Sequence, residues 1–340
     1  MKKTRVAING AGRIGRAFLK AALTRDELEV VAVNDLGSID NIAYLIKYDT
    51  VYGKSPFSVE VSGGNLVVDG KEIKFVSEPD PVKLPWGDLD IDVVVESTGV
   101  FTTYEKAEAH KTAGAKRVVI SAPVKDEPRN ESEATILIGV NDEKLKTCTI
   151  TSNASCTTNA GSPLMQILHE ALGIEKALLN TVHAYTSTQA IVDGPAKKDM
   201  RKGRAAAQNI IPTSTGAAIA TTKAIPELTG LFDGIAMRVP VPAGSIVDVT
   251  FVSKKDTTRD EVNDILRKAA TEERWKPVFT ATDEPIVSSD IIGEKYASIA
   301  DLSMTRVVGG NLVKVLAWYD NEMGYTYALI EHVVRLGSYI

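Results

Sequence analysis

The chain has 340 residues, 44% of them hydrophobic and 24% charged, and its formal net charge is −5 at pH 7. A chain of this length predicts two domains, and the small, mixed charge argues against a general nucleic-acid or membrane-surface binder. No apolar run approaches the roughly 18 residues of a membrane span, so no membrane association is predicted. Two cysteines and the lack of an export signal predict that the protein resides in the reducing cytoplasm. The four histidines are scattered along the chain, so no metal site is predicted.

The first part of the chain carries the order of features typical of a dinucleotide-binding unit. It reads as a strand at 4–9, a helix at 16–24 and a second strand at 29–35. Gly10, Gly12 and Gly15 follow the first strand, and Asp35 ends the second. The glycines allow a tight turn, close approach of a pyrophosphate and close packing of the helix, while Asp35 accepts hydrogen bonds from the adenosine ribose. The alternative is a glycine-rich turn without a ligand.

Alternating strands and helices continue to about residue 152, which predicts a Rossmann-type, doubly wound parallel sheet. Further strands are expected at 92–96, 117–123, 135–139 and 147–151, a helix at 104–113, and hairpin turns at 63–65 and 69–71. Ser97, Thr98 and Gly99 close one strand where a cofactor would lie, and Ser121 stands at the carboxyl end of another. His110 is interpreted as a solvated helix residue.

The stretch SNASCTTN, residues 152–159, holds Cys156 at a strand-to-helix junction. Its neighbours are hydroxyl and amide residues, and the amides of a helix N-terminus favour a thiolate. Local composition supports a nucleophile and a small buried residue equally. Cys148 is placed in the middle of the preceding strand and interpreted as structural.

The second half has a different pattern. A strand at 177–183 ends in His183, and a long polar segment without periodicity follows at 184–207; so long a loop is usually functional. Strands at 234–240, 245–252 and 312–319 and helices at 217–225, 258–273 and 325–336 predict an α+β domain with a mixed, largely antiparallel sheet. His169 and His332 are interpreted as structural helix residues.

Nine blocks in order resemble the phosphorylating glyceraldehyde-3-phosphate dehydrogenase family over nearly the whole chain. They are AINGAGRIGR, LIKYDTVYG, ESTGVF, SAPVKD, SNASCTTN, HAYTSTQ, GRAAAQNIIPTSTGAA, RVPVP and WYDNEMGY. The resemblance implies an NAD-binding domain at 1–155, completed by a C-terminal helix at 320–340, and a catalytic domain at 156–319. It also implies a glycolytic homotetramer that oxidises glyceraldehyde 3-phosphate, with NAD and inorganic phosphate, to 1,3-bisphosphoglycerate.

The same resemblance assigns roles to individual residues. Cys156 is the nucleophile that forms a thiohemiacetal and then a thioester, and His183 is its base. The cofactor-binding residues it implies are Asn9, Gly10, Gly12, Arg13, Ile14, Gly15, Asp35, Ser97, Thr98, Gly99, Ser121 and Asn321. The implied ligands of the two phosphate groups are Ser155, Thr157, Thr186, Thr188, Lys202, Thr215, Gly216 and Arg238.

Several alternatives remain open from the sequence. Erythrose-4-phosphate dehydrogenase shares the cysteine and histidine, but its members do not keep Thr-x-Thr after the histidine or the TSTG block, both of which are present here. A non-phosphorylating aldehyde dehydrogenase would not need the second anion pocket. A non-enzymatic binding role, for example with RNA, would not need Cys156, His183 or the glycines. Asp35 favours NAD, while Gly37 and Ser38 leave NADP as the alternative cofactor.

Overall fold

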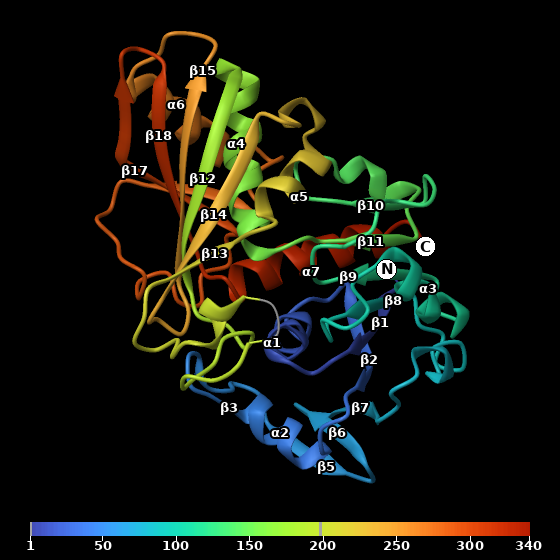
Figure 1. Cartoon of the computed structure of the whole chain (residues 1–340). Coiled ribbons are helices and arrows are strands. Elements are labelled where there is room, and N and C mark those ends of the chain that lie inside the picture. Colours follow the sequence, from blue (N-terminus) through green and yellow to red (C-terminus); the bar gives the residue numbers. More distant parts are fainter. Residues whose placement is uncertain (1, 197–198) are drawn as a thin grey trace. The chain divides into compact units, whose positions relative to one another are not determined.

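The computed structural model describes residues 2–196 and 199–340, and these divide into two compact units. The first unit contains the chain up to Ile136, Asp142–Ala154 and Leu329–Ile340. The second contains Leu137–Asn141 and Ser155–Ala328. Each unit has its own large sheet, coloured blue to green and green to orange, respectively, in Figure 1.

The first unit is built on a nine-stranded sheet in the order β10-β11-β9-β8-β1-β2-β7-β6-β5. Seven strands run parallel: β1 (Thr4–Asn9), β2 (Leu28–Asn34), β7 (Lys71–Val76), β8 (Val93–Glu96), β9 (Arg117–Ile120), β10 (Glu133–Thr135) and β11 (Ile150–Ser152). The antiparallel edge consists of β5 (Val59–Ser62) and β6 (Asn65–Val68), and β3 (Tyr48–Asp49) pairs separately with β4 (Gly53–Lys54). The predicted parallel, doubly wound sheet is confirmed.

Helices of the first unit contact strands of this sheet with their buried sides. They are α1 (Arg13–Ala22), α2 (Ile39–Lys47) and α3 (Tyr104–Thr112), with short η1 (Pro81–Lys83) and η2 (Asp142–Lys146). A Cβ on Gly15 would lie 1.9 Å from the carbonyl oxygen of Gly10, so only glycine lets α1 approach the end of β1 this closely. The β8 run Val93–Glu96 is buried throughout, as expected for a central parallel strand.

The second unit has a mixed seven-stranded sheet in the order β13-β14-β12-β15-β18-β17-β16. Its strands are β12 (Ile174–Ala184), β13 (Ile211–Ser214), β14 (Phe232–Val239), β15 (Ser245–Ser253), β16 (Phe279–Thr282), β17 (Ser298–Val308) and β18 (Leu312–Tyr319). Only the pairs β12–β14 and β16–β17 are parallel, so the predicted largely antiparallel sheet is also confirmed.

Helices α4 (Cys156–Leu172), α5 (Ala217–Ala224) and α6 (Arg259–Thr271) contact strands of this second sheet (Figure 1). Short helices η3 (Met200–Gly203) and η4 (Pro226–Leu228) interrupt the loops. The last helix, α7 (Met323–Gly337), begins in the second unit, and its residues from Leu329 belong to the first.

Two predictions about strands are wrong. The strand predicted at 135–139 ends at Thr135, because the chain turns where the Leu137 N–H donates to Asn141 Oδ1 at 2.8 Å. Cys148 does not lie within a strand, since β11 begins at Ile150, although Cys148 is buried as expected of a structural cysteine. None of the helices in the described ranges has the length and apolar character needed to cross a bilayer.

Candidate active site

Cys156 is the first residue of α4, at the positive end of the helix. Ser155 caps this helix: its Oγ accepts a hydrogen bond of 3.1 Å from the Thr158 N–H and lies 2.7 Å from Thr158 Oγ1. The cap fixes the first turn and therefore the direction of the cysteine side chain. As a whole residue Cys156 is half-buried, whereas Cys148 is buried.

His183 faces this sulfur from the end of β12. Its Nε2 lies 3.3 Å from Cys156 Sγ, although the two residues are 27 positions apart in the chain. The imidazole is 2% exposed and meets the Tyr319 ring edge-on, with centroids 5.9 Å apart. The sequence reasoning thus identified two residues that the fold brings into contact.

Burial dominates the protonation of both groups. It raises the pKa of the Cys156 thiol, and this effect outweighs the opposing influence of Arg238 and of hydrogen bonds from Thr157. It also lowers the pKa of His183 to about 3, with the Arg238 charge adding to the effect. Near pH 7 the substrate-free pair is therefore a neutral thiol and a neutral imidazole. Desolvation and the helix N-terminus therefore act on this thiol in opposite directions.

Arg238 lies directly beside the other nitrogen of His183. The two residues are register partners on the parallel strands β12 and β14, and Arg238 Nη1 lies 2.5 Å from His183 Nδ1. Both nitrogens also lie near the Ala184 carbonyl oxygen, Nδ1 at 2.7 Å and Nη1 at 3.0 Å. Since guanidinium can only donate, Arg238 and the Ala184 carbonyl favour opposite tautomers of His183.

A chain of buried hydroxyl groups supports the site, and two of its members, Tyr319 and Thr181, were not predicted from the sequence. Tyr319 Oη lies 2.9 Å from Thr157 Oγ1 and 2.7 Å from Thr181 Oγ1. The Thr157 hydroxyl is therefore held in place by Tyr319. In the sequence, this arrangement was indicated by Thr181 and His183, which are two positions apart on one strand and therefore point to the same face of the sheet.

The remaining residues suggested as phosphate ligands lie in three places. Thr186 and Thr188 pair through their hydroxyls at 3.0 Å in the loop after β12. Thr215 and Gly216 precede α5, where Thr215 Oγ1 accepts from the Ala217 N–H at 3.2 Å and Gly216 is the N-cap. Lys202 lies half-buried in η3.

The first unit contains a cavity of about 360 Å³ beside the glycine loop. It is lined by the predicted cofactor residues Asn9, Gly10, Gly12, Asp35, Ser97 and Thr98, together with Asn34, Leu36, Glu78, Pro79, Pro81, Leu84, Val100 and Phe101. The predicted residues Arg13, Ile14, Gly15, Gly99 and Ser121 lie outside the lining. Arg13 pairs with Asp49 at 2.8 Å, and the Ser121 N–H donates to the Glu96 carbonyl at 2.9 Å.

The shape and chemistry of this cavity fit a dinucleotide. A Cβ on Gly12 would meet no protein atom within 4 Å, so protein packing does not require glycine there, whereas an approaching pyrophosphate would. Asp35 is held by the N–H groups of Ala11 at 2.7 Å and Gly37 at 2.8 Å, which fixes its carboxylate at the cavity wall. Carboxylate oxygens in this position suit ribose hydroxyls.

Asn321, the last predicted cofactor residue, lies in the second unit. Its Oδ1 accepts hydrogen bonds of 3.1 Å from both the Gly244 N–H and Ser245 Oγ. Its NH₂ group is thereby oriented as a donor. Among the described residues, no group of three or more His, Cys, Asp or Glu side chains is placed to hold a metal ion.

A dinucleotide-binding fold and a thiol close to an imidazole are the features of one class of protein, the NAD-dependent oxidoreductases. Two family descriptions match the chain: "Glyceraldehyde 3-phosphate dehydrogenase, NAD binding domain" over residues 4–104 and "Glyceraldehyde 3-phosphate dehydrogenase, C-terminal domain" over residues 155–321. The chain belongs to the glyceraldehyde-3-phosphate dehydrogenase family.

Curated relatives support the same family along almost the full chain. Glyceraldehyde-3-phosphate dehydrogenase of Thermotoga maritima is 52% identical over 330 residues, covering 96% of this chain and 97% of the relative. The enzyme of Clostridium acetobutylicum is 50% identical, covering 96% of each chain. The enzyme of Geobacillus stearothermophilus is 48% identical, covering 99% of this chain and 98% of the relative.

Proposed function

We propose that this chain oxidises glyceraldehyde 3-phosphate, with NAD and inorganic phosphate, to 1,3-bisphosphoglycerate in glycolysis, with Cys156 as nucleophile and His183 as base. The observation that carries the proposal is the 3.3 Å contact between Cys156 Sγ and His183 Nε2 at the start of α4. A thiol within hydrogen-bond reach of an imidazole is the arrangement that covalent aldehyde oxidation requires.

His183 moves two protons in this scheme. As Cys156 Sγ attacks the aldehyde carbon, Nε2 takes the thiol proton and returns it to the carbonyl oxygen, which gives a thiohemiacetal. Nε2 then accepts the hydroxyl proton as that carbon is oxidised to a thioester. NAD, when bound, supplies the hydride acceptor. Inorganic phosphate attacks the thioester carbon, the C–S bond breaks with the Cys156 thiolate as leaving group, and Nε2 returns its proton to that thiolate, which restores the neutral pair.

For His183 to act as base, its proton must reside on Nδ1, facing the Ala184 carbonyl at 2.7 Å. Arg238 opposes that tautomer as long as it donates to Nδ1. We assign Arg238 to the substrate phosphate, together with Thr186 and Thr188. An anion bound there draws the guanidinium charge away from His183 and favours the basic tautomer.

The attacking phosphate is assigned to Ser155, Thr157, Thr215 and Gly216, with Lys202 as a further basic residue. Hydroxyls and backbone N–H groups near helix N-termini suit an anion. In the cofactor unit, the residues assigned to NAD are Asn9, Gly10, Gly12, Arg13, Ile14, Gly15, Asp35, Ser97, Thr98, Gly99 and Ser121, and Asn321 is assigned to the nicotinamide carboxamide.

One assay tests the reaction. NADH formation from glyceraldehyde 3-phosphate is measured with and without phosphate. We expect continuous turnover with phosphate, and without it a burst of about one equivalent per active site, because the thioester accumulates. Sustained turnover without phosphate would indicate a hydrolytic enzyme. Repeating the assay with erythrose 4-phosphate addresses the alternative substrate, which the relatives do not favour because they are named for glyceraldehyde 3-phosphate.

The proposal also covers the oligomeric state, the compartment and the domain bounds. The enzyme is a homotetramer. It acts in the cytoplasm, where reducing conditions keep the free thiol of Cys156 reactive. Its NAD-binding domain spans residues 1–155 with the C-terminal helix at 320–340, and its catalytic domain spans residues 156–319.

A further inference from the structure

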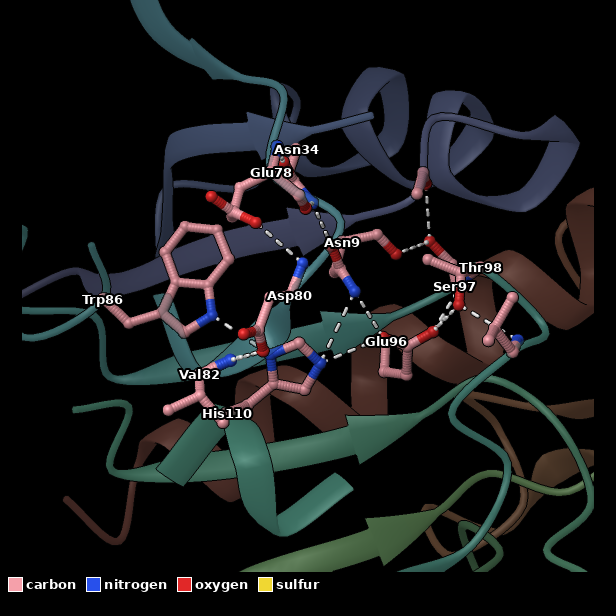
Figure 2. A network of polar contacts seen from close by, with 12 residues as sticks. Asn9, Asn34, Glu78, Asp80, Val82, Trp86, Glu96, Ser97, Thr98 and His110 are labelled. Atoms are coloured by element: carbon pink, nitrogen blue, oxygen red, sulfur yellow. Dashed lines mark hydrogen bonds and ion pairs between the residues drawn. The ribbon is translucent and has the colours of Figure 1, made fainter. Parts of the chain in front are cut away.

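Glu96 is a buried carboxylate at the cofactor end of the first sheet. It is the last residue of β8 and is 1% exposed. Its Oε2 accepts from Asn9 Nδ2 at 2.6 Å and lies 3.0 Å from His110 Nε2. Its Oε1 accepts from the Thr98 N–H at 2.8 Å and from the Thr98 hydroxyl. Four contacts to donors offset the cost of burying the carboxylate, which Figure 2 shows between Asn9, His110 and Thr98.

The neighbouring His110 was predicted to be solvated, and that prediction is wrong, because its side chain is 0% exposed. Trp86 Nε1 lies 3.1 Å from His110 Nδ1. An indole nitrogen can only donate, so Nδ1 accepts and the hydrogen of the neutral ring is on Nε2, facing Glu96. Trp86 thus fixes the tautomer that donates to the carboxylate.

The network joins three strand ends that line the cavity. Asn34, at the end of β2, donates to Asn9 Oδ1 at 2.7 Å and to the Glu78 carbonyl at 3.0 Å (Figure 2). Asn9, Asn34, Glu78 and Thr98 all line the cavity, whereas Glu96 does not. Glu96 is therefore placed to act on a ligand only through these neighbours.

The turn at 97–99 and the glycine loop are in close contact. Gly10 has φ +100°, and a Cβ there would lie 2.7 Å from Thr98 N. Ser97 Oγ donates to the Gly10 carbonyl at 2.7 Å. A shift of Thr98 would thus displace the loop that faces the pyrophosphate.

We propose that Glu96 is a positioning residue for NAD: it holds the turn at 97–99 and Asn9 in the cofactor-binding arrangement before the cofactor arrives. This inference rests on the assignment of NAD to this cavity. It gives the buried acid of β8 a role in cofactor affinity rather than in folding alone.

Glu96→Gln is a sharp test because it keeps size and shape. Asn9 Nδ2 and His110 Nε2 both donate, so the glutamine oxygen must stay on their side. Trp86 prevents His110 from switching to an acceptor. The glutamine NH₂ group then faces Thr98, whose hydroxyl accepts but whose backbone N–H cannot. The substitution therefore removes the acceptor of one backbone group, the Thr98 N–H.

The experiment compares the wild-type enzyme, Glu96→Gln and Glu133→Gln. Glu133 is a matched control in the same unit: a buried carboxylate on β10 that accepts from the Arg129 N–H at 2.7 Å and does not line the cavity. We expect Glu96→Gln to raise the Kd and KM for NAD about tenfold, with kcat within about twofold. Alkylation of Cys156 without cofactor should proceed at the wild-type rate. Glu133→Gln should lower Tm but keep the wild-type Kd.

Hydrogen exchange of the wild-type protein without NAD supplies a second readout if Glu96→Gln does not fold. The Thr98 amide should be protected in the cofactor-free protein. Fast exchange there, a wild-type Kd for NAD in Glu96→Gln, or an equal loss in Glu133→Gln would overturn the inference. Failure of the wild-type enzyme to bind NAD would instead count against the proposed function.

Discussion

At the residue scale, His183 is held between two partners with conflicting demands. The Ala184 carbonyl requires a hydrogen on Nδ1, whereas Arg238 Nη1 approaches the same nitrogen as a donor. Burial and this nearby charge together keep the imidazole neutral. In the proposed reaction, His183 Nε2 would therefore become fully available as a proton acceptor when an anion engages Arg238.

His183→Asn tests this role directly. Asparagine retains a side-chain amide near the Ala184 carbonyl but has no basic nitrogen to take the thiol proton. We expect the steady-state rate to fall by about 10²–10⁴-fold, the usual range for loss of acid–base catalysis. His169→Asn is the matched control, because His169 lies on α4 and its Nδ1 accepts from the Ile174 N–H at 3.2 Å. A nearly unchanged rate in His183→Asn would show that another residue is the base.

Asp35 decides cofactor choice by charge and by loop geometry. Its carboxylate would repel a 2′-phosphate, so NAD should be preferred over NADP in kcat/KM. Asp35→Ala should reduce the difference in kcat/KM between NAD and NADP, because it weakens the binding of NAD and removes the repulsion of the NADP 2′-phosphate. Loss of the acceptor for the Ala11 and Gly37 N–H groups will also loosen the loop. Asp40→Ala, on the neighbouring α2, removes an equal charge and should leave the ratio unchanged. Wild-type kcat/KM with NADP equal to that with NAD would contradict the assignment.

Site residues that belong to a local sequence motif could be predicted from the sequence. Residues brought together from different strands and helices by the fold could not. Gly10, Gly12 and Asp35 follow from a local pattern in which each glycine has a geometric reason. Glu96 and His110 did not, because their contacts with each other, Asn9 and Trp86 join residues 14 to 101 positions apart. An acid ending a run of three valines was a visible signal of a buried carboxylate.

At the element scale, His332 fixes the end of α7 to the first unit. Its Nδ1 lies 3.2 Å from Asn153 Oδ1, and its Nε2 lies 2.8 Å from Thr151 Oγ1. Both contacts suit a neutral ring, with Nδ1 donating and Nε2 accepting from the threonine hydroxyl. Burial, followed by the Arg335 charge, lowers the pKa of His332 to about 3. The structural role predicted for this histidine is consistent with these contacts.

This histidine makes stability pH-dependent. Below pH 6.5, His332 binds a proton in the unfolded chain, whereas the folded protein binds one there only near pH 3. The free energy of unfolding therefore falls as the pH drops from 6.5 to about 3. At pH 5 the loss from His332 is about 2 kcal/mol. His332→Asn keeps a donor toward Asn153 but cannot titrate, so its free energy of unfolding should fall less between pH 7 and pH 5. Urea unfolding at both pH values measures this. An equal fall in variant and wild type would refute the linkage.

Strong periodicity made long elements predictable, whereas elements without it were missed. The helix predicted at 258–273 is α6 (Arg259–Thr271), with Thr258 as its cap. In contrast, β17 was missed, because its residues Ser298–Leu302 are all buried and do not alternate. Ala154, with φ +52° two residues before Cys156, has a conformation that no sequence pattern indicated.

At the scale of the whole molecule, the second unit exposes apolar side chains on its sheet. Leu178 on β12 is 67% exposed and Ile235 on β14 is 49% exposed. A cavity of about 830 Å³ lies here, lined by residues that include Leu178, Leu231 and Leu312. Apolar patches of this kind mark interaction surfaces, which supports the proposed association of four chains.

The final prediction concerns this association. Sedimentation equilibrium at micromolar concentration should give four times the chain mass of 36.6 kDa. Leu178→Asp and Ile235→Asp should each yield smaller species, because a carboxylate in a closed apolar interface loses its hydration. Val61→Asp, at a 37% exposed apolar position on β5 of the first unit, is the matched control and should remain tetrameric. A wild-type monomer would refute the tetramer, and intact tetramers in both sheet variants would place the subunit contacts elsewhere.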